Sequence, residues 1–97
     1  MNIRLERSGG FAGIRQTRSI SSDELSGEEA KKMTDLVEAA RFFELPEVLR
    51  SSTPGADRFQ YNVFVETGKR KHAVQVDEAA LTDGLRALIG WVRKVAH

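Results

Sequence analysis

Few side chains in this sequence could perform catalysis or bind a metal ion. Its 97 residues include two histidines and no cysteine, which removes disulfides, thiolate zinc sites and cysteine nucleophiles together. His72 and His97 stand far apart, outside the His-Glu-x-x-His spacing that lets two imidazoles share a zinc ion. Ser8 lacks both a nucleophile-elbow motif and an identifiable base. We therefore expect no enzyme, no catalytic residue, no metal site and no cofactor, and we expect His72 to be a strand-surface residue.

Two acidic pairs, Asp23-Glu24 and Glu28-Glu29, have the composition of a general acid/base site. Both lie where a helix is predicted to begin, and the positive end of the helix dipole favours carboxylates in a first turn. The dipole accounts for these pairs better than an active site does.

Basic residues could contact phosphates at Lys69-Arg70-Lys71, Arg15 and Arg18. The net charge is only +1, however, and residues 21–49 carry eight acidic side chains against three basic ones. Aromatic residues are not interleaved with the basic ones. We interpret Lys69–Lys71 as a solvated hairpin tip and expect neither a nucleic-acid nor a membrane partner.

The segment Arg7-Ser8-Gly9-Gly10-Phe11-Ala12-Gly13 surrounds one aromatic residue with small ones. A phosphate-binding loop is excluded, because no lysine follows Gly13 and the next element is a strand. Gly9-Gly10 suits a hairpin turn, since glycine reaches positive φ without steric cost, but such a turn needs neither Ala12 nor Gly13. Phe11 either inserts into a pocket of a partner or folds back over the core. The pattern leaves both possibilities open.

Hydrophobic periodicity predicts the order β-β-α-β-β-α. Alternation around Ile3 and Leu5, and the turn-free stretch 14–20, predict a hairpin. A helical stripe predicts a first helix over 24–43, with Ser26 and Glu29 at capping-box spacing. Residues 59–66 and 72–76 alternate as strands around a turn at 67–69, and a second helix begins at Asp77 or Thr82. The apolar face of that helix comprises Leu81, Leu85, Leu88, Val92 and Val95.

This order predicts an α+β fold, a four-stranded antiparallel sheet with two helices packed on one face, in a single domain over residues 1–97. Phe42-Phe43 and Trp91 are expected in the core. Phe64 faces away from the other apolar residues of its strand, as an uncovered aromatic or an association surface.

Chain direction predicts which loops share an end of the sheet. If each connection is local, Arg7–Gly13, Pro46–Asp57 and Asp77–Thr82 lie at one end of the molecule, and Lys69–Lys71 lies at the other.

The N-terminus lacks the apolar region of a secretory signal, and no segment approaches the ~20 apolar residues of a membrane span. With 40% hydrophobic and 30% charged residues the composition is that of a soluble protein. We expect a cytoplasmic monomer or weak dimer.

Several short motifs follow one another along the chain. They are Arg7–Gly13 after a short strand, Phe42-Phe43-Glu44-Leu45-Pro46 at the end of the first helix, Asp57-x-Phe59-x-Tyr61, and His72-x-Val74-x-Val76-Asp77 before the last helix. In this order, over nearly the whole chain, they resemble the emfourin family, small bacterial proteins that inhibit thermolysin-like metallopeptidases. The resemblance implies a protein inhibitor that binds and sterically blocks the active-site cleft of such a peptidase.

Thermolysin-like enzymes cleave before a bulky apolar residue, and Gly10-Phe11 has that form. We hypothesise that Phe11 fills the primed-side pocket, that the Gly10 carbonyl approaches the zinc ion and that Ser8-Gly9 pairs with an edge strand of the enzyme. The predicted partner-binding residues are Arg7, Ser8, Gly9, Gly10, Phe11, Ala12 and Gly13. The alternatives are a protein-binding module that uses the same segment on another partner, and a weak nucleic-acid binder.

Overall fold

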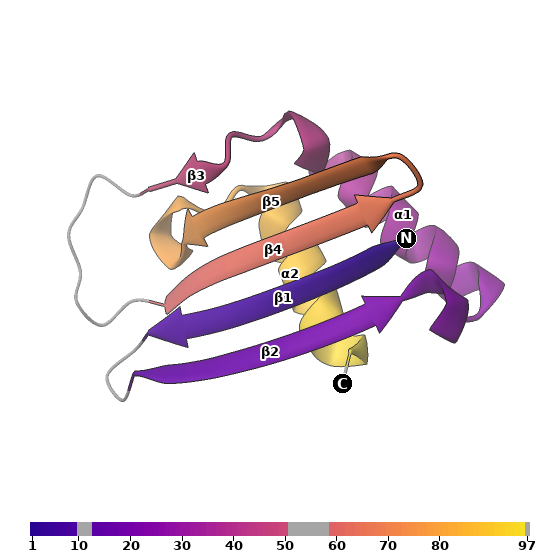
Figure 1. The fold of residues 1–97 in the computed structure, drawn as a ribbon, viewed down its shortest axis with the longest axis horizontal. Helices are drawn as coiled ribbons and strands as arrows, with labels where there is room; N and C mark the ends of the chain where they lie inside the picture. Colours follow the sequence, from indigo (N-terminus) through magenta and orange to yellow (C-terminus); the bar gives the residue numbers. More distant parts are fainter. Residues whose placement is uncertain (10–12, 51–58, 97) are drawn as a thin grey trace.

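One sheet carries both helices on the same face (Figure 1). The computed structural model describes residues 1–9, 13–50 and 59–96. Within these residues the sheet has five strands in the order β2-β1-β4-β5-β3. The strands are β1 (Asn2–Gly9), β2 (Ile14–Ser21), β3 (Val48–Leu49), β4 (Phe59–Thr67) and β5 (Arg70–Asp77). The helices are α1 (Gly27–Ala39) and α2 (Asp83–Val95), with 3₁₀ turns η1 (Ser22–Glu24), η2 (Phe42–Glu44) and η3 (Glu78–Ala80).

The predicted α+β class with two helices is confirmed, but the four-stranded antiparallel sheet is wrong in detail. A fifth strand, β3, lies parallel to β5 and makes the described sheet mixed. Val48 pairs with Gln75 and Leu49 with Val76, and the backbone N–H of Gln75 donates to the carbonyl of Glu47 at 2.8 Å. Two residues are too few to show a period of two, so hydrophobic alternation could not reveal this strand.

β1 is paired along its whole length on both sides, with β2 and with β4, in antiparallel register. Alternate residues of the strands point to the helices and to solvent. On β1, Ile3 and Leu5 are buried beneath the helices, whereas Arg4 between them is exposed. The buried residues of the strands and helices form one core: Ile3, Leu5, Ile20, Met33, Val37, Phe42, Tyr61, Val63, Val65, Val74, Val76, Leu85, Leu88, Ile89, Val92 and Ala96.

The first helix is shorter than the predicted span 24–43. Ser26 caps α1 by accepting from the backbone N–H of Glu29 at 3.2 Å, so the helix begins at Gly27. It ends at Ala39 because Arg41 takes the left-handed conformation (φ 50°) that commonly terminates helices. The flanking residues form η1 and η2 instead. The capping-box spacing marked Ser26 correctly, but the predicted span began before this cap, and the end had no glycine to mark it.

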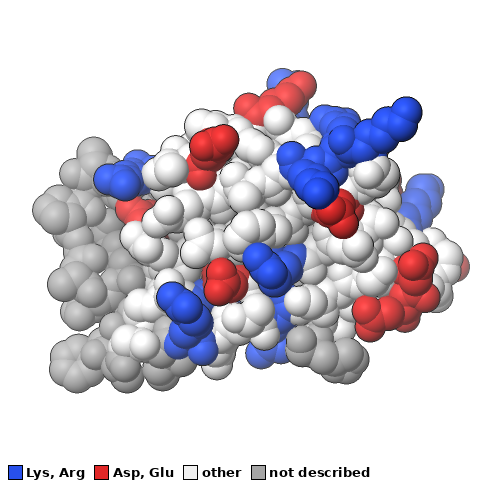
Figure 2. All heavy atoms as spheres, in the orientation of Figure 1, with Lys and Arg blue, Asp and Glu red and all other residues white. Residues whose placement is uncertain are grey.

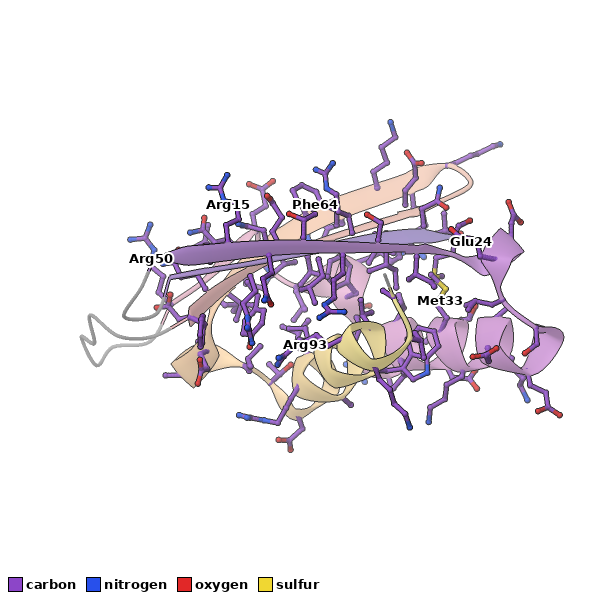
Figure 3. All side chains as sticks on the ribbon, turned by 90° about the horizontal axis from the view of Figure 1, so that it is seen from below. Arg15, Glu24, Met33, Arg50, Phe64 and Arg93 are labelled. Atoms are coloured by element: carbon purple, nitrogen blue, oxygen red, sulfur yellow. The ribbon has the colours of Figure 1, made fainter. Side chains whose placement is uncertain are left out.

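Three aromatic predictions concern the two faces of the sheet. Phe42 is 1% exposed, so its assignment to the core is confirmed. Phe64 points away from the helices, as an uncovered aromatic (Figure 3), and the guanidinium of Arg4 lies 4.3 Å from its ring centroid. Trp91 is partly buried against the core.

The expectation that His72 is a strand-surface residue is wrong. The ring is half-buried, its Nε2 lies 2.7 Å from the carbonyl oxygen of Leu45, and its ring centroid lies 5.5 Å from that of Phe42. Because a carbonyl oxygen only accepts, Nε2 must donate. His72 therefore connects η2 to β5 and serves the packing of the fold.

Thr82, not Asp77, caps α2, because its hydroxyl accepts from the backbone N–H of Leu85 at 3.2 Å. Asp77 precedes η3. α2 crosses α1 at close range at Gly84: a Cβ there would lie 2.6 Å from the Cα of Ala40 and 3.1 Å from its Cβ. This glycine is needed for the approach of two backbones. Gly90, in the same helix, has no atom of the described residues within 4 Å of its ideal Cβ.

The two glycines of α2 provide a matched test of this crossing. We expect Gly84→Ala to lower the free energy of unfolding by about 1–3 kcal/mol, since backbone must shift to admit the methyl group. Gly90→Ala should raise it by up to about 1 kcal/mol through helix propensity. Urea unfolding of both variants measures the difference. Equal shifts in the same direction would contradict the close helix crossing.

Candidate functional site

The ends of β1 and β5 and the starts of β2 and β4 meet at one end of the sheet, on the left in Figure 1. Gly9 pairs with Ile14 on one side and with Phe59 on the other, and Gln60 pairs with Asp77. We call these strand ends, with η3, the loop-bearing end. The predicted common end is thus confirmed for the described residues that flank segment 10–12 and for Asp77. It is wrong for the start of segment 46–57, because the preceding residue, Leu45, contacts His72, which pairs with Val65 toward the opposite end. Gly10, Phe11, Ala12 and residues 51–58 lie outside the described residues.

The opposite end of the sheet carries the basic hairpin tip. Thr67 pairs with Arg70 and Glu66 with Lys71, next to the start of β1 at Asn2. Lys71 forms an exposed ion pair with Glu66 at 3.5 Å. Lys69–Lys71 is therefore separated from the loop-bearing end by the length of the strands, as predicted.

Glycines with positive φ stand on both sides of the segment 10–12. Gly9 has φ 99° and Gly13 has φ 63°. A side chain at either position would be strained, because L-residues rarely adopt these angles. This explains Gly13, which a two-glycine turn did not require. Ser8, one residue earlier, remains in the regular ladder opposite Arg15 and Gln60.

Side chains tie the strand ends together beyond the backbone ladder. The backbone N–H of Phe59 donates to the Glu78 carboxylate at 3.4 Å, which connects β4 to η3. The Gln60 amide donates to Asp77 Oδ1 at 3.2 Å and accepts from Gln75 Nε2 at 3.3 Å. These contacts hold the start of β4 against the end of β5 and against η3. The residues on either side of the loops are therefore supported by side chains as well as by the backbone ladder.

Arg7 is half-buried on the helix-covered side of the sheet. Its Nη2 donates to Gln16 Oε1 at 3.0 Å, and its guanidinium carbon lies 4.4 Å from the ring centroid of Phe59. Sequence reasoning placed Arg7 among the partner-binding residues but found neither Gln16 nor Phe59 as its neighbours. Both depend on the strand register, which no motif encodes.

Two hollows lined by described residues lie away from the loop-bearing end. One lies on the uncovered face of the sheet around Arg4, Phe64 and Ala73. The other lies at the opposite end, between α1, η2 and the β4–β5 turn, with Phe43 and Arg70 in its lining.

Charge is mixed on the uncovered face, where basic and acidic side chains alternate (Figure 2). Arg15 and Arg18 lie on opposite faces of β2: Arg15 points away from the helices (Figure 3), and Arg18 donates to the carbonyl of Ala96 at the end of α2 at 3.3 Å. The candidate phosphate contacts are thus divided between two faces and two ends. This distribution does not form the continuous basic surface that nucleic-acid binding uses.

The dipole explanation is confirmed for Glu28-Glu29 and is wrong for Asp23-Glu24, which precede the N-cap of α1. Glu28 and Glu29 occupy the first turn of α1, and Asp23 and Glu24 lie in η1. No group of three metal-binding side chains comes together within the residues that the structure describes. In the same part of the chain, neither helix has the length and apolarity to span a membrane.

The fold and the loop-bearing end define a small α+β protein with a positive-φ glycine at the end of β1, Gly9, and another just before β2, Gly13. A sequence model of the family described as Emfourin matches residues 5–93. The chain belongs to the emfourin family, whose members are peptidase inhibitors and not enzymes.

A solved structure similar to this chain is that of emfourin from Serratia proteamaculans, described as an M4 family peptidase inhibitor. The two are 21% identical, the match covers 99% of this chain and 89% of that chain, and the TM-score is 0.49. A comparison with curated proteins found no significant match.

The strained backbone at Gly13 can be tested directly. We expect Gly13→Ala to lower the free energy of unfolding by about 1–2 kcal/mol, the cost of placing an L-residue in the left-handed region. Gly27→Ala is the control, because neither glycine has an atom within 4 Å of its ideal Cβ in the described residues and Gly27 has no positive φ. Thermal unfolding of both variants gives the comparison. A loss at Gly27 equal to that at Gly13 would contradict the backbone explanation.

Proposed function

We propose that this chain inhibits a thermolysin-like metallopeptidase of the M4 family by placing its loop-bearing end in the active-site cleft. The observation that carries the proposal is the emfourin family match over residues 5–93. The finer part, the way in which the cleft is blocked, is argued from the chemistry of the segment Arg7–Gly13 and from its support.

The pairing of Gly9 with β2 and β4 favours inhibition over rapid cleavage of the segment. Gly9 is held by β2 on one side and β4 on the other, so the chain that enters the loop is fixed by two ladders. A peptide fixed at both ends loses little conformational entropy on binding, which favours affinity. The same constraint opposes the movement toward the transition state for hydrolysis. A segment that resembles a substrate can in this way bind well and be cleaved slowly.

Phe11 is the proposed anchor. Its ring fills the primed-side pocket, and the Gly10 carbonyl approaches the zinc ion of the peptidase. The hypothesis that Ser8-Gly9 pairs with an edge strand of the enzyme is wrong, because both residues already pair with β2 on one side and with β4 on the other. A standard interface buries about 800 Å² per partner, more than so short a segment supplies. Segments 46–57 and 77–82 contribute the rest, because their described parts, such as Leu49 and η3, belong to the same half of the sheet.

Replacement of the anchor tests this proposal. We expect Phe11→Ala to raise the inhibition constant against a thermolysin-like peptidase by more than about tenfold, or 1.4 kcal/mol. Phe64→Ala is the control, because Phe64 lies on the uncovered face away from the loop-bearing end. Inhibition by a folded Phe11→Ala protein that equals the wild type would reject this residue as the anchor. No inhibition by the wild type would reject the function itself.

Neutralisation of the basic tip tests the orientation. The double variant Lys69→Gln/Lys71→Gln should leave the inhibition constant within about twofold, since exposed charges remote from an interface contribute little binding energy at physiological ionic strength. A large loss of potency in this variant would show that the inhibitor docks through the opposite end.

A further inference from the structure

The sheet face turned away from the helices carries polar and charged side chains from four strands (Figures 2 and 3). Among the described residues, no helix covers this uncovered face (Figure 1). The strand register arranges its side chains in four rows, each with one residue from β2, β1, β4 and β5. From the opposite end to the loop-bearing end, these rows are Ser21-Asn2-Glu66-Lys71, Ser19-Arg4-Phe64-Ala73, Thr17-Glu6-Asn62-Gln75 and Arg15-Ser8-Gln60-Asp77.

The charges on the uncovered face balance, with three basic and three acidic side chains in the four rows. Lys71 pairs with Glu66 in the first row at 3.5 Å. Arg4 and Glu6 are neighbours on β1, yet neither forms an ion pair within the residues that the structure describes. Arg4 lies over the ring of Phe64 instead, and Glu6 is half-buried. Two opposite charges near the centre of the face are therefore available to a partner.

A two-fold axis across the strands brings these charges together in two copies of the chain. If the axis lies between the Arg4 row and the Glu6 row, the second row of one copy faces the third row of the other, and the first faces the fourth. Arg4 then lies opposite Glu6 of the second copy, and Lys71 lies opposite Asp77. Each contact occurs twice, because a two-fold interface is self-complementary. An axis along the strands, between β1 and β4, would place only Arg15 opposite a carboxylate.

The sizes of the side chains are complementary in the same arrangement. Phe64 lies opposite the smaller Asn62 of the second copy, and Ala73 lies opposite the longer Gln75. A large side chain against a small one lets two sheets approach to the separation of about 10 Å at which sheets pack. The hollow around Phe64 and Ala73 is thus filled by side chains of the second copy.

We propose that the uncovered face is a self-association surface, on which a second copy of this chain docks about a two-fold axis between Arg4 and Glu6. Four strands about 4.8 Å apart, each of eight residues at about 3.3 Å, form a face of roughly 20 by 25 Å, or about 500 Å². A standard interface buries about 800 Å² per partner. The dimer is therefore weak, with a dissociation constant in the micromolar to millimolar range.

Dimerisation leaves the loop-bearing end of each copy accessible. The axis runs across the strands and reverses their direction, so the two loop-bearing ends point away from each other. Each copy retains its own surface for a peptidase, and the inference does not depend on the proposed function.

Reversal and exchange of the central charges test the arrangement, with sedimentation equilibrium of the full chain up to millimolar concentration. We expect Arg4→Glu to raise the dissociation constant of the dimer at least about tenfold, because it places like charges opposite each other. The double variant Arg4→Glu/Glu6→Arg restores opposite charges and should return the constant to within about threefold of the wild type. Arg86→Glu is the control, since Arg86 is an exposed residue of α2 in the other layer, and it should leave the constant unchanged. Circular dichroism verifies that each variant is folded.

Four outcomes would overturn the proposal. A wild type that stays monomeric would do so, and slower amide exchange on the uncovered face in a peptidase complex would then assign this face to the peptidase. A dimer unaffected by Arg4→Glu would form through another surface. Failure of the double variant to recover association would reject the opposition of Arg4 and Glu6. An equal loss in Arg86→Glu would show an effect of net charge and not of this face.

Discussion

The rest of the structure depends on the pairing of β1 with a strand on each side. Antiparallel strands must align their polar backbone groups, and a shift by one residue would move every side chain to the opposite face. Ile3 and Leu5, buried beneath the helices, oppose such a shift. With this register set, Gly9 must lie between Ile14 and Phe59. The hydrophobic pattern in the middle of the sheet therefore determines which residues meet at its end.

The same constraint places different parts of the chain at the two ends of the sheet. At one end, the β4–β5 turn with its basic residues is a short hairpin with exposed side chains. At the other, strands from three parts of the chain converge, with polar contacts from Gln60, Asp77 and Glu78 and with Arg7 across the sheet. The opposite end also joins distant segments, through the contacts of Met1 with Ser22 and of Arg70 with Phe43. At the loop-bearing end, two strand ladders hold the residue that precedes the proposed inhibitory segment, Gly9. A protein that blocks a cleft by shape requires such a support, because each segment that must be ordered on binding costs conformational entropy.

Much of this fold could be predicted from the sequence, for reasons that particular elements show. The alternation in β4 is a local signal and predicted the strand, and the capping-box spacing identified Ser26 as a capping residue although the predicted span began at residue 24. β3 could not be predicted, because a two-residue strand depends on Gln75 and Val76, which are remote in the chain. The end of α1 at Arg41 and the inward position of His72 also depend on tertiary packing: the ring of His72 packs against Phe42, and its Nε2 donates to Leu45.

The candidate site also combines features that could be predicted from the sequence with features that depend on tertiary structure. The small residues around Phe11 indicated Arg7–Gly13 as a candidate binding segment. The chain direction predicted that three loops lie at the same end of the sheet. The positive φ of Gly13 and the contact of Arg7 with Phe59 required the strand register. The identity of the anchor, Phe11, is still a prediction from sequence and lies outside the described residues.

Amide hydrogen exchange of the inhibitor, free and in complex with a thermolysin-like peptidase, tests the docking orientation most directly. Exchange should slow on complex formation in peptides that cover residues 9–14 and 51–60, and it should stay unchanged in those that cover the turn at 67–71. Protection confined to the turn, with residues 9–14 exchanging as in the free protein, would contradict an inhibitor that binds by its loop-bearing end.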